Sequence, residues 1–198
     1  MANYIQKHIS LIDNKVLING EEVFSVDKNE DFITFVKSVY KNYAIKYGKF
    51  YKMDALSKLG FLATELLLKD VDRGDILPEE TAIICANKSS SLHTDAKYQN
   101  TLAEIPSPAV FVYTLPNIVL GEICIRNMIR GESLFLIQDS FDREFICDYV
   151  NDILDNTNTR MSITGWIEID RNEEYRVELY LVSNSKTKKE FIASQLVQ

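Results

Sequence analysis

Ser140 is a candidate nucleophile because of its position in the sequence. It follows the apolar run of residues 134–137 and precedes residues 141–154, whose apolar spacing predicts a helix. A serine hydroxyl at such a strand-to-helix turn can attack an acyl group only with the help of an adjacent general base. The chain has two histidines, His8 and His93, and we expect both to be surface or loop residues rather than bases.

The residues around Ser140 favour a structural role. Asp139 and Ser140 are both preferred N-cap residues, whose side-chain oxygens accept hydrogen bonds from the first free N–H groups of a helix. The carboxylates of Asp139 and Asp142 also make this turn unfavourable for a thiolate, because like charges repel. We therefore assign no catalytic residue and expect Asp139 and Ser140 to cap the helix.

Other chemistry has little support in the sequence. The run Ser89, Ser90 and Ser91 could bind a phosphate group, but it lacks the glycine spacing of a P-loop and is more typical of a plain polar loop. No cluster of His, Cys or Asp has the spacing of metal ligands. We expect neither a metal nor a cofactor.

The elements that position these residues alternate between strands and helices in the middle of the chain. Residues 8–26 alternate apolar and polar side chains, and the turn signals Asp13-Asn14 and Asn19-Gly20 predict a hairpin there. Strands are predicted at residues 81–86, 134–138, 161–170 and 175–183. Helices are predicted at residues 32–47 with a stop at Gly48, and at 52–69, 95–102, 117–129 with a stop at Gly131, 141–154 and 187–197.

This alternation predicts an α/β layered protein with a largely parallel inner sheet. At 198 residues the chain is long enough for one large domain or two small ones, and we expect one, residues 1–198.

Three segments, in order and with fitting spacing, resemble the N-terminal half of β-ketoacyl-(acyl carrier protein) synthases. The first is the predicted helix of residues 52–69 with the strand and serine-rich loop TAIICANKSSS. The second is LPNIVLGEICIRNMIRG, similar to that family's PN-x-x-x-G-x-x-A-I helix and its closing glycine. It matches at Pro116, Asn117, Gly121, Ile125 and Gly131, with Cys124 in place of the usual alanine. The third is SLFLIQDSFD, followed by a helix and MSITGWIE.

The resemblance covers about residues 52–168 and implies a function for the turn at Ser140. In the family a nucleophilic cysteine lies about nine residues past the glycine equivalent to Gly131, and this count gives Ser140. Counting back from Gly165 gives the same register. Chain-length-factor proteins, which are inactive partners of active synthases, look similar in lacking a cysteine at or near this position, where Gln138 also lies. The chain is about half as long as such an enzyme, whose second half supplies the decarboxylating residues.

The resemblance therefore implies an α/β thiolase-like half-fold, in which helices pack on a mixed sheet and the N-terminal and C-terminal hairpins are additions. In the family, dimers form by antiparallel pairing of the strand before the nucleophile. That strand begins here at Leu134 and ends at Gln138 (residues 134–138). The resemblance therefore implies a homodimer, or a heterodimer with a full-length synthase. An acyl carrier protein is a further candidate partner.

The charge and the cysteines limit the class of protein. The formal net charge is −7, which argues against a nucleic-acid surface. The closest approach to a basic patch is a cluster of Lys186, Lys188 and Lys189, with Arg126 and Arg130 on one predicted helix. The cysteines Cys85, Cys124 and Cys147 are far apart in apolar contexts and are expected to be buried free thiols in a reducing compartment. No segment approaches 18 consecutive apolar residues, so we expect a cytoplasmic protein with no membrane span.

Three functions are compatible with these observations. The first is a non-catalytic partner or scaffold in fatty-acid or polyketide-type synthesis. The second is a degenerate acyltransferase or thioesterase that uses Ser140. The third is a repurposed interaction or ligand-binding module unrelated to acyl chemistry.

Overall fold

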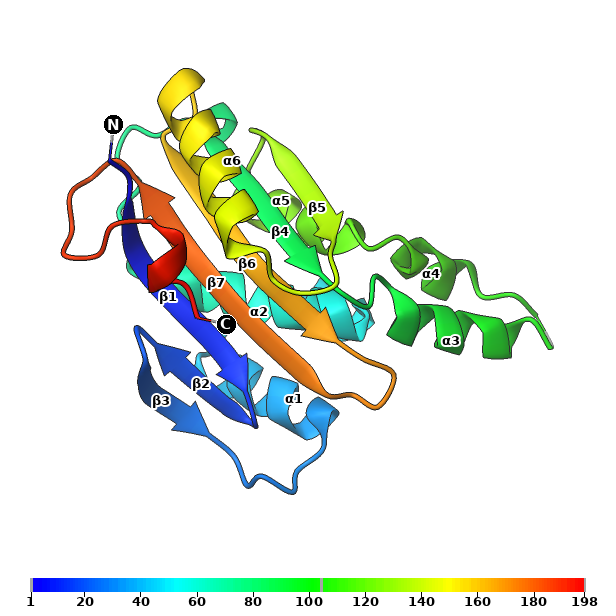
Figure 1. The fold of residues 1–198 in the computed structure, drawn as a ribbon. Helices are drawn as coiled ribbons and strands as arrows, with labels where there is room; N and C mark the ends of the chain where they lie inside the picture. The colour runs from blue at the N-terminus through cyan, green and yellow to red at the C-terminus, as the bar shows by residue number, and fades with distance from the viewer. Residues whose placement is uncertain (1, 104, 198) are drawn as a thin grey trace.

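The computed structural model of the chain describes residues 2–103 and 105–197. Its strands form one seven-stranded sheet in the order β3-β2-β1-β7-β6-β4-β5 (Figure 1). The strands are β1 (Tyr4–Ile12), β2 (Lys15–Ile18), β3 (Glu21–Ser25), β4 (Thr81–Asn87), β5 (Ser133–Ile137), β6 (Met161–Ile169) and β7 (Tyr175–Ser183).

Helices cover both faces of this sheet (Figure 1). The α-helices are α1 (Phe32–Asn42), α2 (Ala55–Leu68), α3 (Leu92–Thr101), α4 (Pro108–Phe111), α5 (Ile118–Asn127) and α6 (Arg143–Asn156). Short 3₁₀ turns are η1 (Gly48–Lys52), η2 (Pro78–Glu80), η3 (Val112–Thr114) and η4 (Ala193–Gln195). Helices α1, α2 and α5 share one hydrophobic core, while α6 and the C-terminal segment share a second core on the opposite face.

The sheet is mixed, as predicted. Strand β4 pairs in parallel with β5 on one side and with β6 on the other. The pairs β6–β7, β7–β1, β1–β2 and β2–β3 are antiparallel. The predicted parallel arrangement therefore applies only to β5, β4 and β6, which come from the middle of the chain.

All seven residues of β4 are buried because both faces of the sheet are covered at this strand. Its side chains alternate between the two cores. Ile83 and Cys85 lie in the core beneath α2, and Ala82 and Ile84 lie in the core beneath α6.

The N-terminal turns form where the sequence predicts them. Asp13 and Asn14 join β1 to β2 with φ angles of 49° and 59°, and Asn19 and Gly20 join β2 to β3 with 54° and 89°. Positive φ at both central residues defines the type I′ turn of two-residue hairpins. The predicted hairpin is thus a three-stranded antiparallel unit.

Two helix ends differ from the prediction. Helix α1 ends at Asn42 instead of continuing to Gly48, and Ala44 adopts the left-handed conformation at φ 50°. Helix α5 ends at Asn127, where Met128 is the left-handed cap at φ 54°. Gly131 serves a different purpose, because a Cβ there would collide with the backbone carbonyl oxygen of Thr81.

The predicted helix at residues 187–197 is wrong. This segment is irregular apart from η4, and Glu190 forms an isolated β-bridge with Tyr4. Phe191 and Leu196 are buried in the core beneath α6. Burying both side chains outweighs the weak propensity of an isolated eleven-residue helix, which is marginal in water.

Within the described residues, no single helix is long and apolar enough to cross a membrane. One pair of helices bent by 97°, Pro108–Thr114 with Ile118–Asn127, meets the requirements of a span in length and composition alone.

Candidate functional site

The turn that contains Ser140 follows the edge strand β5. The backbone N–H of Gln138 donates to the carbonyl oxygen of Asn87 at 2.9 Å, so pairing with β4 continues one residue beyond the strand. Asp139 and Ser140 then form an exposed bend. Among the described residues, no hydrogen bond joins the Ser140 hydroxyl to another residue, and the side-chain oxygen of Gln138 is buried without a partner. Ser140 is thus accessible, but no described residue orients or activates its hydroxyl by a hydrogen bond.

The helix cap is Asp142, and the prediction that Asp139 and Ser140 cap the helix is wrong. The Asp142 carboxylate accepts a hydrogen bond from the N–H of Phe145 at 3.0 Å, and α6 begins at Arg143. Phe141 and Ile146, which flank this cap, both belong to the core beneath α6, in the positions of a hydrophobic staple. Ser140 therefore lies three residues before the helix, and the first N–H groups of α6 serve Asp142 instead.

His8 is buried, which corrects the expectation of a surface residue. Its Nε2 lies 2.7 Å from Glu178 Oε2, and its ring stacks on Tyr180 with centroids 4.3 Å apart. The other Glu178 oxygen accepts from Ser10 Oγ at 3.0 Å and from Arg176 Nε at 3.1 Å. This cluster lies on β1 and β7.

The buried cluster cannot assist the serine after β5. Strands β7, β6 and β4 lie between β1 and β5. Four strand spacings separate the two elements, which is roughly 19 Å. Proton transfer needs a base within hydrogen-bond reach or one water away. His8 is therefore no base for Ser140.

His93 is also buried, in the first turn of α3 and not in a polar loop. Its Nε2 lies 3.3 Å from Glu173 Oε1, and its Nδ1 has no partner among the described residues. Burial lowers the pKa of His93, and the nearby Lys97 adds to this effect. Neither histidine hydrogen-bonds to Ser140 within the part of the chain that the structure describes.

Hydrogen-bonding groups of the serine-rich loop after β4 are already engaged by residues outside the loop. The N–H groups of Lys88 and Ser89 donate to Glu168 Oε2 at 2.6 and 3.2 Å. Ser91 Oγ donates to the carbonyl oxygen of Thr114 at 2.6 Å. An anion would have to displace the Glu168 carboxylate, so the geometry supports the prediction of a plain loop.

The three cysteines are free thiols, as expected. Cys85 and Cys147 are buried, and Cys124 is half-buried. Burial raises the pKa of each thiol, to about 12 for Cys147. A thiol with such a pKa is protonated at neutral pH and is a poor nucleophile. Within residues 2–103 and 105–197, no group of three or more His, Cys, Asp or Glu side chains could hold a metal ion.

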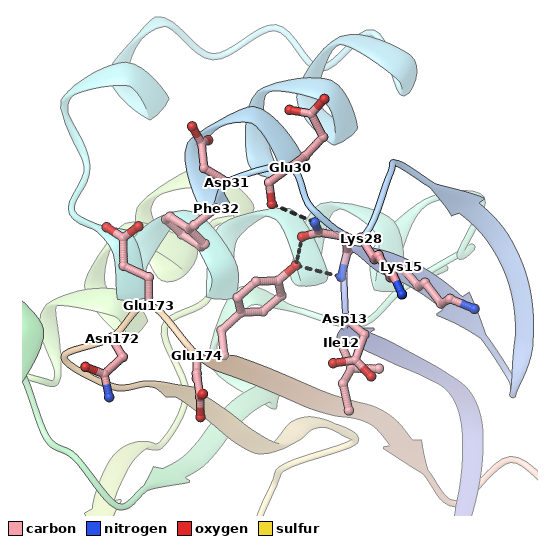
Figure 2. Close-up of a pocket in the computed structure, with 12 residues that line it drawn as sticks. Ile12, Asp13, Lys15, Lys28, Glu30, Asp31, Phe32, Asn172, Glu173 and Glu174 are labelled. Carbon is pink, nitrogen blue, oxygen red and sulfur yellow. Dashed lines mark hydrogen bonds between the residues drawn. The ribbon is translucent and has the colours of Figure 1, made fainter.

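A large hollow lies away from Ser140, between the β1–β2 turn, the start of α1 and the β6–β7 turn (Figure 2). Its volume is about 920 Å³. Tyr175 Oη and Asn14 Oδ1 are 2.8 Å apart, and Asn14 Nδ2 donates to the carbonyl oxygens of Asp27 and Glu30. These bonds hold the N-terminal turn against β7, so these polar groups have a structural role. Sequence reasoning did not find this hollow, because three distant segments form it.

The face of the sheet that carries α6 is partly covered by the C-terminal segment. The N–H of Val197 donates to Tyr180 Oη at 2.7 Å, and Arg143 Nη1 donates to the carbonyl oxygen of Leu196 at 3.2 Å. The resemblance implies a half-fold with a C-terminal addition, and the C-terminal segment covers part of this face without forming the predicted helix.

Solved structures with a similar fold include ketosynthases and a ketosynthase in complex with its chain length factor. The ishigamide ketosynthase/chain length factor is 12% identical with a TM-score of 0.67, and the match covers 96% of this chain and 64% of that one. A ketosynthase in complex with its chain length factor from Xenorhabdus doucetiae is 12% identical with a TM-score of 0.61, over 93% and 80%. A β-ketoacyl synthase from Burkholderia phymatum is 8% identical with a TM-score of 0.59, over 92% and 59%.

The chain therefore has a ketosynthase-like, thiolase-type fold, and the resemblance read from the sequence is confirmed at the level of the fold. It spans less than two thirds of the first of these chains. No protein-family model matches the sequence. No curated protein matches it in sequence either.

Proposed function

We propose that the protein is a non-catalytic, ketosynthase-like partner in polyketide or fatty-acid biosynthesis. The observation that carries this proposal is the state of the turn after β5. The resemblance equates Ser140 with the nucleophile, yet this serine is exposed, precedes the helix by three residues and has no hydrogen-bonded base among the described residues. Structures of the same fold include complexes of a ketosynthase with its chain length factor.

The partner-binding element in this proposal is the outer edge of β5. Strand β5 pairs with β4 on one side only, and it stands at the end of the sheet. A free edge presents unpaired N–H and C=O groups that another strand can bind. Ile137 on this strand is 52% exposed. A homodimer or a heterodimer with a full-length synthase would satisfy this edge by strand pairing.

Exposed apolar residues near this edge support the same interface. Ile125 and Met128 are 67% and 65% exposed, on and just after α5, which packs beside β5. Helices α3 and α4 form an arm that extends past the end of the sheet on the same side (Figure 1). Phe111 and Leu115, in and after this arm, are also more than half exposed. Apolar groups exposed in this number mark an interaction surface.

The test is co-expression of the chain with a full-length ketosynthase, followed by co-purification. We expect a stoichiometric complex, and the chain alone should carry out no condensation. Association with an acyl carrier protein can be measured in the same experiment. Failure to bind either protein would favour a repurposed interaction or ligand-binding module instead.

A degenerate acyltransferase or thioesterase that uses Ser140 is the weaker alternative. It needs a general base that reaches the hydroxyl. The buried His8 and His93 are each engaged with a carboxylate, Glu178 and Glu173 respectively. The features in its favour are the exposed hydroxyl and the register that equates Ser140 with the nucleophile.

A further inference from the structure

A small cavity between α1, η1, α2 and the α3–α4 arm is surrounded by lysines. Its volume is about 230 Å³, and Lys52, Lys58 and Lys97 line it from η1, α2 and α3. Ile33, Met53 and Val110 form an apolar wall. Three cations from separate elements thus line one half-open cavity, in a chain with a formal net charge of −7.

The carboxylate in this lining is already occupied. Asp54 caps α2, where its Oδ1 accepts from the N–H of Ser57 at 2.9 Å, and its Oδ2 accepts from Thr94 Oγ1 at 2.6 Å. Lys58 Nζ donates to the carbonyl oxygen of Met53 and lies 5.8 Å from the centre of the Phe50 ring. The cavity therefore has more positive than negative charge, and its one acid is committed to holding α2 against α3.

The remaining two lysines have weak or no partners. Lys97 Nζ is 3.9 Å from Glu173 Oε1, at the limit of an ion pair, and its side chain is 56% exposed. Lys52 makes no ion pair with any described residue. Tyr113, which also lines the cavity, donates its hydroxyl to Glu122 at 2.9 Å, and Lys49 Nζ lies 2.9 Å from that carboxylate. Like charges placed together raise the energy of each other, and a bound anion removes this cost.

From this arrangement we propose that the cavity binds a small oxyanion, a carboxylate or phosphate group carried on a short apolar chain. The lysines bind the charged group, and the wall of Ile33, Met53 and Val110 binds the chain. The volume lies below the roughly 300–1,000 Å³ of sites for drug-sized ligands, so the occupant is small or is the end of a larger molecule. Burial lowers the pKa of Lys58, and a bound anion would oppose that shift.

Calorimetric titration of the full chain with butyl phosphate, butyrate and inorganic phosphate tests this proposal. The titrations are run at about 10 mM ionic strength, where screening is weak. One saturable site is expected for a butyl probe, and the stronger of the two probes identifies the anionic group. Inorganic phosphate should bind several-fold more weakly than butyl phosphate, since each buried methylene adds roughly fourfold in affinity.

Three lysine variants separate a built site from diffuse attraction. Lys58→Met and Lys97→Met should each weaken binding at least about fivefold, since a charge-assisted contact is lost. Lys188→Met removes the same charge from the exposed C-terminal segment and should leave the affinity within about twofold. Lys97 is exposed, so its variant decides the outcome if Lys58→Met does not fold. Absence of saturable binding, or equal losses in all three variants, would overturn the proposal.

Discussion

The carboxylate of Asp142, two residues beyond Ser140, accepts a hydrogen bond from the backbone N–H of Phe145 at 3.0 Å. This bond fixes the start of α6 and leaves Ser140 outside the helix. Phe141 reinforces the same start, because its ring packs on Trp166 with centroids 5.8 Å apart. The residue that the resemblance equates with a nucleophile therefore lies outside the helix, and no base among the described residues hydrogen-bonds to it.

Removal of this cap should destabilise the protein selectively. We expect Asp142→Ala to lower the free energy of unfolding by about 1 kcal/mol, the usual effect of losing an N-cap side chain. Ser140→Ala and Asp139→Ala, at exposed positions of the same turn, should change it by less than about 0.5 kcal/mol. Urea denaturation followed by circular dichroism measures all three. An equal loss of unfolding free energy in Ser140→Ala would contradict the assignment of the cap to Asp142.

Gly165 should tolerate no side chain. It adopts a φ of 146° on β6, and a Cβ there would collide with the backbone carbonyl oxygen of Glu178 on β7. Gly165→Ala should therefore cost more than about 2 kcal/mol. Gly121→Ala, in α5 with open space around the glycine, should instead be neutral or stabilise by up to about 1 kcal/mol. The unfolding midpoints of the two variants compare the positions directly.

Acid should destabilise the fold in part through His93. Burial lowers the pKa of His93 in the folded state, so the unfolded chain binds a proton more readily at this residue. The corresponding part of the stability is present above the unfolded pKa of about 6.5 and is lost as the pH falls through the folded value. Unfolding measured between pH 7.5 and 5 should show a steeper decline for the native chain than for His93→Gln. Identical pH profiles would contradict this assignment.

No acyl group should accumulate on Ser140. Incubation with acyl thioesters of several chain lengths, followed by peptide mass spectrometry, should show no adduct at residues 138–142. The physical reason is the high pKa of an unassisted hydroxyl. An acyl-serine that disappears in Ser140→Ala would support the acyltransferase alternative.

Local signals in the sequence were sufficient for much of the fold. The type I′ turns at Asp13-Asn14 and Asn19-Gly20 require residues that tolerate positive φ, and the sequence supplies them next to alternating strands. Helix α2 was also predicted well, because Asp54 is its N-cap and its apolar face is broad. Each of these features depends on residues close together in the chain.

The predictions from sequence were wrong where residues far apart in the chain determine the local structure. The burial of His8 depends on Glu178, which is 170 positions away, and on the pairing of β1 with β7. The start of α6 depends on the packing of Phe141 against Trp166, which selects one cap among the polar residues of the turn. The C-terminal segment depends on a core that Phe191 and Leu196 complete. The cavity lined by Lys52, Lys58 and Lys97 was missed for the same reason.

The most direct test of the proposed partner role is the affinity of the chain for a co-expressed ketosynthase, with one charge placed at either edge of the sheet. Ile137→Lys alters the free edge of β5, and Val23→Lys alters the opposite edge strand β3, where Val23 is 45% exposed. We predict that Ile137→Lys weakens the complex at least about tenfold, because a buried unpaired lysine opposes strand pairing, while Val23→Lys leaves the affinity unchanged. Binding that is absent in the native chain, or that is equally insensitive to both substitutions, would contradict a partner role through β5.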